Sequence, residues 1–273
     1  MQPLNQPSDK GILKAEEGFK HFALARFEPD ARLSSFLEHY WVVRWDLRGQ
    51  APYRQTILSY PNVNLSFERE KGGTFAGLYG IPKATYTRHL EGEGQVLGMK
   101  FRPGGFYPFW EKPVSLLTGE IVPLEAVFGE EARGLAERLF ALDSEEARVR
   151  AAEQFLLDRL PAADPDMELV QAVLQRVIEN RSMVRVEDMA AGFGLSTRSL
   201  QRLFHRYVGV TPKWVIQRYR LQEAAELMEK GTSPDWARLS LDLGYYDQAH
   251  FSKDFKAMIG KSPQDYVKEA SFS

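Results

Sequence analysis

Cationic and hydrogen-bonding side chains recur at helical spacing in the segment RSLQRLFHRYVGVTP (198–212). If this segment is a helix, Arg198, Arg202 and His205 lie on one face, because each residue of a helix turns by about 100°. Residues 196–220 contain six Lys and Arg and no Asp or Glu. Guanidinium, ammonium and imidazole groups bind DNA phosphates and base edges. The pattern favours nucleic-acid binding, and a solvated helix face is the alternative.

Apolar residues occupy the opposite face of this segment, so the helix has one side to bury. Val186, Met189, Ala190 and Phe193 form a second apolar stripe just before it. Gly194 permits the positive φ of a tight turn between the two helices, and Ser196 is placed to cap the second one. Two short amphipathic helices joined in this way predict a helix-turn-helix, whose second helix enters the DNA major groove.

The same pattern returns in FSKDFKAMIGKSP (251–263), with Gly244 at the turn and Asp247 at the cap position. Between the copies, residues 213–230 contain no Pro and no Gly and predict one helix of about 27 Å. Successive major-groove segments on one side of DNA lie about 34 Å apart. Two recognition helices on such a rod fit about two turns of duplex, although an internal repeat is also typical of a binding-inert scaffold.

Before this helical region the chain has a different pattern. Residues 20–101 alternate short β-branched and aromatic segments with Gly, Pro and Asn turns, which predicts antiparallel strands. Residues 130–160 predict two helices, and PAADPD (161–166) predicts a linker. We therefore expect an α+β protein of two domains: an antiparallel β-barrel or sandwich with accessory helices over 1–160, and an all-α tandem helix-turn-helix over 167–273.

Composition excludes several functional classes. The 273 residues contain no cysteine, which excludes disulfides, thiolate metal sites and cysteine nucleophiles. The formal net charge is −2, so any electrostatic attraction to DNA must be local. The beginning of the chain lacks a signal-peptide core and no long apolar run is present, so we expect a cytoplasmic protein with no membrane partner.

Three stretches resemble the DNA-binding domain of AraC/XylS-type bacterial transcription regulators: GLSTRSLQRLFHRYVGVTP, RLQEAAELM and GYYDQAHFSKDFKAMIGKSPQDYV. The resemblance covers residues 167–270 and implies a tandem helix-turn-helix that binds promoter DNA. It implies base and phosphate contacts by Arg198, Gln201 and Arg202 in the first unit, and by Gln248, His250, Ser252 and Lys253 in the second. By charge and position we add His205 and the phosphate anchors Arg206, Arg218 and Lys256.

The strand-rich half also resembles the N-terminal domain of some regulators of this family, through PDARLSSFLEHYWVVRWDL and GMKFRPGGFYPF. This resemblance implies a small-molecule sensor, a dimerisation domain, or both. Aromatic groups with a few polar ones suit a ligand pocket, and strand aromatics are also typical core residues. The candidate ligand-binding residues are Trp41, Arg44, Tyr60, Asn64, Phe67, Arg102, Phe106 and Trp110. The helices of 130–160 are candidates for a dimer interface or for packing on their own domain.

We expect double-stranded promoter DNA and RNA polymerase as partners, with a small-molecule effector and a second copy of the chain as further candidates. No cofactor, metal or catalytic residue is expected. Two alternatives stay open: a ligand-independent dimeric regulator, and a metal-dependent barrel enzyme with a DNA-binding appendage. His21, His39 and His89 lack the close spacing of a metal site. DNA-repair methyltransferases that share this DNA-binding module need an acceptor cysteine, which this chain lacks.

Overall fold

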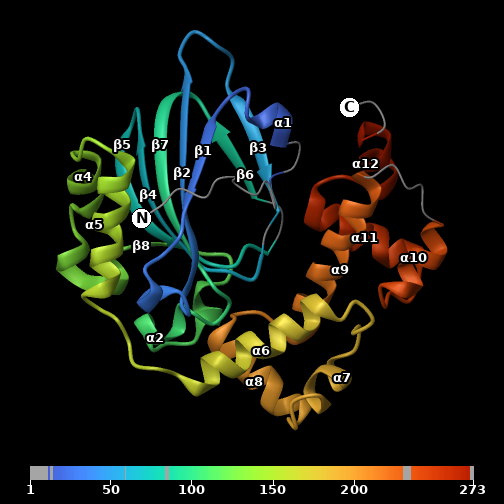
Figure 1. Ribbon diagram of the computed structural model, residues 1–273. Coiled ribbons are helices and arrows are strands. Elements are labelled where there is room, and N and C mark those ends of the chain that lie inside the picture. The colour runs from blue at the N-terminus through green and yellow to red at the C-terminus, as the bar shows by residue number, and fades with distance from the viewer. Residues whose placement is uncertain (1–11, 13–14, 59, 84–85, 230–234, 271–273) are drawn as a thin grey trace.

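The computed structural model describes residues 12, 15–58, 60–83, 86–229 and 235–270 (Figure 1). A six-stranded antiparallel sheet has the order β1-β2-β7-β4-β5-β8, and β3 and β6 form a separate two-stranded sheet. The strand bounds are β1 Ala23–Phe27, β2 Leu37–Leu47, β3 Tyr53–Ile57, β4 Asn64–Glu70, β5 Gly73–Tyr79, β6 Tyr86–Leu90, β7 Gly92–Phe101 and β8 Ile121–Pro123.

The large sheet is open, so the closed barrel among our expectations is wrong, whereas the two-domain α+β class is confirmed. Strands β1 and β8 lie at the two edges. Closure would require them to pair, but β8 has only three residues and ends at Pro123, which has no backbone donor. The two-stranded sheet instead covers part of one face of the large sheet.

Alternate residues of the large sheet face two different environments. Tyr40 and Val42 of β2, Phe67 of β4 and Met99 of β7 belong to the hydrophobic core. This face packs on α4 (Leu135–Phe140) and α5 (Glu145–Leu157), which Figure 1 shows on one side of the sheet, with β3 and β6 on the other. The apolar faces of α4 and α5 are therefore covered by the chain's own sheet. Of the two roles expected for residues 130–160, a dimer interface or packing on their own domain, the structure shows the packing.

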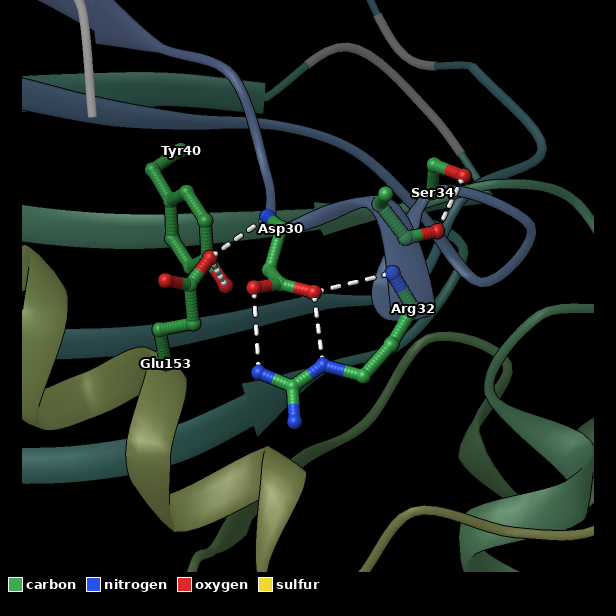
Figure 2. A network of polar contacts seen from close by, with 6 residues as sticks. Asp30, Arg32, Ser34, Tyr40 and Glu153 are labelled. Carbon is green, nitrogen blue, oxygen red and sulfur yellow. Dashed lines mark hydrogen bonds and ion pairs between the residues drawn. The ribbon is translucent and has the colours of Figure 1, made fainter.

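A polar network fixes α5 to the connection between β1 and β2 (Figure 2). The Glu153 carboxylate accepts a hydrogen bond from the Asp30 backbone N–H at 2.7 Å and one from the Tyr40 hydroxyl at 3.2 Å. Asp30 in turn accepts from the Arg32 backbone N–H at 2.9 Å and pairs with its guanidinium at 2.8 Å. Burial, reinforced by the Glu153 charge, raises the pKa of Tyr40. The tyrosine therefore stays a neutral donor to Glu153.

The C-terminal region is helical throughout its described residues apart from short turns. Short helices and 3-10 turns interrupt the first half: α1 (Ala15–Gly18), η1 (Ala31–Leu33), α2 (Tyr107–Trp110), η2 (Val114–Leu117), α3 (Glu125–Phe128) and η3 (Gly129–Ala132). The later helices are α6 (Pro165–Glu179), α7 (Val186–Ala191), α8 (Thr197–Tyr207), α9 (Pro212–Glu229), α10 (Trp236–Asp242), α11 (Gln248–Ile259) and α12 (Pro263–Ala270). Among the described residues, no helix is long and apolar enough to cross a membrane.

Two hydrophobic clusters divide the helical region at the middle of α9. The first is continuous from the sheet through α6, α7 and α8 to Val215 and Ile216 of α9. The second begins at Leu221 of α9 and includes the apolar side chains of α10, α11 and α12. The first helix-turn-helix unit therefore shares its core with the sheet region, and the second has a core of its own. The domain division at 161–166 stays a prediction.

Candidate nucleic-acid interface

The first helix-turn-helix unit is formed by α7 and α8. Gly194 lies in the turn with φ 66°, a conformation that glycine adopts without strain. The Ser196 hydroxyl accepts a hydrogen bond from the Ser199 backbone N–H at 3.1 Å and so caps α8. Leu200, Phe204 and Tyr207 bury the inner face of α8. The opposite face is consequently directed away from the core.

Three of the predicted DNA contacts lie together at the N-terminal half of this outer face. Arg198, Gln201 and Arg202 are exposed, and the described part of the chain offers them no hydrogen bond or ion pair. Base edges are contacted by the N-terminal residues of a recognition helix. Side chains at these positions are thus available to a ligand outside the protein.

The C-terminal end of α8 is attached to the sheet region. The Ser115 hydroxyl of η2 lies 3.0 Å from His205 Nε2. Arg206 donates from Nε to the Tyr107 hydroxyl of α2 at 2.5 Å, and its guanidinium lies 4.7 Å from the Tyr107 ring centroid. The hydrogen bond to Tyr107 raises the pKa of Arg206. Both predicted DNA contacts remain exposed, but each already has an intramolecular partner.

The second unit repeats the geometry of the first with α10 and α11. Gly244 has φ 78° and packs against Val184, and the Asp247 carboxylate caps α11 by accepting from the His250 backbone N–H at 2.7 Å. His250 also lies 3.6 Å from the Asp254 carboxylate. The outer face carries the predicted contacts Gln248, His250, Ser252, Lys253 and Lys256, of which Ser252 is half-buried and the others are exposed. Sequence alone therefore predicts both caps and both turns.

Helix α9 joins the two units and has 18 residues, as the sequence predicts (Figure 1). Arg218 on this helix is only 4% exposed, and its guanidinium lies 5.2 Å from the Trp214 ring centroid. Burial lowers its pKa to about 10. The phosphate contact that we predict for Arg218 is wrong, because α9 packs that side chain inside the molecule. Arg220 is also buried and donates to the Val177 carbonyl at 2.5 Å.

Two family profiles match the chain, one in each half. A family profile described as "Helix-turn-helix domain" matches residues 189–269, and one described as "Domain of unknown function (DUF6597)" matches residues 25–123. The chain carries an AraC-type helix-turn-helix domain. The matched residues contain α8 and α11 together with α9 and α10 between them, so the AraC-type domain includes both predicted recognition helices.

The curated relatives are transcriptional regulators matched over part of their length. The regulator MtrA of Neisseria gonorrhoeae is 32% identical over 98 residues, which is 36% of this chain and 32% of MtrA. The transcriptional activator NphR of a Rhodococcus species is 34% identical over 104 residues, which is 38% of this chain and 30% of NphR. The chain thus spans about a third of the length of these relatives. A probable AraC family regulator from Rhodopseudomonas palustris is 28% identical in its crystal structure, with a TM-score of 0.35, over 38% of this chain and 97% of that one.

A cavity of about 460 Å³ lies between the two sheets of the N-terminal half. It brings together three of the eight predicted ligand-binding residues, Trp41, Tyr60 and Asn64. The other five lie outside it. Phe67 and Phe106 are buried in the hydrophobic core, Arg44 pairs with Glu145, Arg102 donates to the Ser34 carbonyl, and Trp110 is half-buried in α2. Arg26, His39 and Lys100 line the cavity and are absent from our prediction.

The electrostatics of this cavity differ between its two ends. At one end, burial and the Lys100 charge lower the pKa of His39 to about 4, and burial lowers the pKa of Lys100 against the opposing effect of Glu38. At the other end, Glu68 accepts from Arg88 Nη2 at 2.6 Å and from the Tyr79 hydroxyl. Arg88 also pairs with Glu70, so one guanidinium faces two carboxylates at that end, whereas at the other end Lys100 pairs with Glu38.

The three histidines that a metal-dependent enzyme would use lie apart from one another. His21 stacks on Tyr53 with 4.0 Å between ring centroids, His39 faces the cavity, and His89 is exposed. Within the described ranges, no three His, Asp or Glu side chains are grouped so that they could hold a metal ion.

Proposed function

We propose that this protein is a DNA-binding transcription regulator that inserts α8 and α11 into adjacent major-groove segments. The observation that carries the proposal is the pair of capped helices, each with an exposed polar outer face, at the two ends of α9. Arg202 is placed to make a bidentate contact to guanine, and Gln201 and Gln248 to pair with adenine. Lys256 and Arg206 serve as phosphate anchors. Residues 167–273 form the DNA-binding part.

Control of DNA binding by a small molecule in the cavity belongs to the same proposal. Its support is a pair of residues that follow β3, Leu58 and Tyr60, which contact the cavity on one side and the helical region on the other. Leu58 and Tyr60 line the cavity. Leu58 also packs against the second hydrophobic cluster, and the Tyr60 ring lies 6.5 Å from that of Tyr219 on α9. A ligand that displaces this segment would move α9.

Selection of DNA fragments by the full-length protein, followed by footprinting, tests the proposal. We expect an enriched site of about two helical turns, because the two units are joined by a helix of about 27 Å. Arg202→Ala and Lys253→Ala should each weaken binding, and Arg48→Ala, which removes an exposed cation from the turn after β2, is the matched control. A protected site of one turn, or equal affinity of all three variants, would contradict it.

RNA polymerase and a second copy of the chain are the protein partners that we propose for a regulator of this type. The buried faces of α4 and α5 are unavailable to a second copy, because Leu139 and Val149 already lie in the chain's own core. Sedimentation of the protein with and without its selected DNA distinguishes one copy from two on each site. A ligand-independent regulator would show the same footprint with every small molecule tested.

A further inference from the structure

The hydrogen bonds that cap α8 and α11 give the two predicted recognition helices a common register. Ser196 and Asp247 each accept from the backbone N–H three positions ahead, at Ser199 and His250. Counted from these caps, the fourth, eighth and eleventh residues are buried in both helices: Leu200, Phe204 and Tyr207 in α8, and Phe251, Phe255 and Met258 in α11. Each residue on the outer face of one helix therefore has a counterpart on the other.

The middle of each outer face is a stripe formed by the second, fifth, sixth and ninth residues after the cap. At about 100° per residue, these positions project opposite the buried ones. The stripe consists of Arg198, Gln201, Arg202 and His205 in α8, and of Ala249, Ser252, Lys253 and Lys256 in α11. All of these residues are exposed except Ser252, which is half-buried. The two stripes are thus equivalent surfaces with different chemistry.

Ala249 occupies the position in α11 that Arg198 occupies in α8. It lies between two predicted DNA contacts, Gln248 and His250, which project about 100° to either side of it. His250 is directed along the flank of the helix, where it lies 3.6 Å from the Asp254 carboxylate. The group at the centre of the first turn of α11 is therefore an exposed methyl group.

A methyl group at this position suits one base better than the others. The thymine C5-methyl lies in the major groove, and alanine is among the side chains that contact it. The other bases present hydrogen-bond donors and acceptors there, which a methyl group would remove from water without offering a partner. Lys253 and Lys256, in the same stripe, complement the charge of the phosphates beside the groove. The outer face of α11 therefore fits a major groove that contains thymine.

We propose that Ala249 is a specificity-determining residue that contacts a thymine methyl group. The half-site of each helix is the turn of duplex that it contacts, and the half-site of α11 has thymine where that of α8 has guanine opposite Arg198. Guanine fits Arg198 because a guanidinium can donate to its O6 and N7 together. About 10–10.5 base pairs separate the two bases. The inference rests on the proposed DNA binding and names the bases that distinguish its two half-sites.

Replacement of thymine by uracil in the selected DNA tests the contact, because uracil differs from thymine only in lacking the C5-methyl group. Each thymine of the site is replaced in turn, and the affinity of the full-length protein is measured by fluorescence anisotropy. One replacement in the half-site of α11, which is the half whose protection Lys253→Ala weakens, should reduce the affinity of the wild type about fourfold. Ala249→Gly should bind the thymine and uracil forms of that site equally. Replacements in the half-site of α8 are the control and should affect both proteins alike.

Exchange of residues between the two units provides a second readout. Ala249→Arg should change the base selected at its position from thymine to guanine, and Arg198→Ala should remove the preference for guanine in the other half-site. Thermal unfolding checks that each variant is folded, and Ala249→Arg decides the question if Ala249→Gly, which puts glycine in a helix, is not folded. An equal loss on uracil in the wild type and in folded Ala249→Gly, or selection of thymine by folded Ala249→Arg, would overturn the contact.

The same selection separates this inference from the proposed function. An enriched site of about two turns with no thymine in the half-site of α11 would overturn the role of Ala249 and leave the DNA-binding proposal intact. Failure to enrich any site would contradict the proposed function, and the role of Ala249 with it.

Discussion

The contact between Arg206 and Tyr107 makes a quantitative prediction about DNA binding. Tyr107→Phe removes the hydroxyl that Arg206 Nε contacts at 2.5 Å, while the ring keeps its place 4.2 Å from that of Tyr207. Hydrogen bonds to charged groups contribute about 1.5–3 kcal/mol when buried, but Arg206 is exposed, and solvent reduces the contribution to about 0.5–1 kcal/mol. Because a phosphate would compete with Tyr107 for the same guanidinium, the variant should bind DNA about two- to fivefold more tightly.

A double-mutant cycle isolates this effect. DNA affinity is measured by fluorescence anisotropy on the selected site for wild type, Tyr107→Phe, Arg206→Gln and the double variant. The gain from Tyr107→Phe should vanish when Arg206 is absent, because no guanidinium is then released. An equal gain in both backgrounds, or weaker binding by Tyr107→Phe alone, would refute competition between the hydroxyl and phosphate.

The site and the fold make three further predictions. Lys256→Ala should weaken binding to all DNA sequences alike and reduce the salt slope by about 1, whereas Arg202→Ala should relax the preference at one base pair, as binding assays on site variants at several salt concentrations would show. The pKa of His39 falls from an ordinary 6.5 to about 4 on folding, so the unfolded chain takes up the proton first as the solution is acidified. The free energy of unfolding should therefore be independent of His39 above about pH 6.5 and fall by about 3 kcal/mol as the pH is lowered to about 4. In urea unfolding at several pH values, His39→Asn should lack this dependence. Gly244→Ala should cost more stability than Gly194→Ala in thermal unfolding, because both glycines have positive φ but only Gly244 has a side chain close to its missing Cβ.

Local signals in the sequence are sufficient for the two recognition helices. Ser196 and Asp247 cap their helices through hydrogen bonds to residues three positions ahead, and Gly194 and Gly244 supply positive φ within the same short segments. None of these features depends on distant parts of the chain. This is why the caps, the turns and the 18-residue helix α9 can be predicted from spacing alone.

Side chains whose environment is set by distant contacts are not predictable in this way. Arg206 and Arg218 look alike in sequence, yet Arg206 is exposed beside Tyr107 and Arg218 is buried over Trp214. The difference arises because α9 packs into the molecule while the outer face of α8 does not. Helical periodicity gives the direction of a side chain on its own helix, but not what lies opposite.

The cavity illustrates the same limit for strands. Alternation of apolar and polar residues predicts that each strand has one buried face. It does not tell whether an aromatic residue on that face lines a pocket or packs in the core. Phe67 belongs to the core face, whereas Trp41 lies on the cavity face. The available signal is the polar residues that share a strand face with Trp41: His39 precedes it by two positions, and Lys100 follows Gly98 by two. Polar residues two positions from an aromatic residue on the same strand face indicate that this face lines a cavity and does not pack in the hydrophobic core.

The position of the cavity relative to α9 bears on how a ligand would act. Tyr219 packs against the first hydrophobic cluster, and Leu221 begins the second. Tyr60 and Leu58, which line the cavity, contact α9 and the second cluster at this boundary. A bound molecule would therefore act where one core ends and the other begins, and not on either recognition helix. Since the first unit shares its core with the sheet, a ligand that acts as we propose would shift the second unit, which contacts the rest of the chain through Leu58 and through Val184 beside Gly244, and so change the spacing between α8 and α11. Control through spacing would require both units to contact DNA at once, as we propose for the two units joined by the 18-residue helix α9.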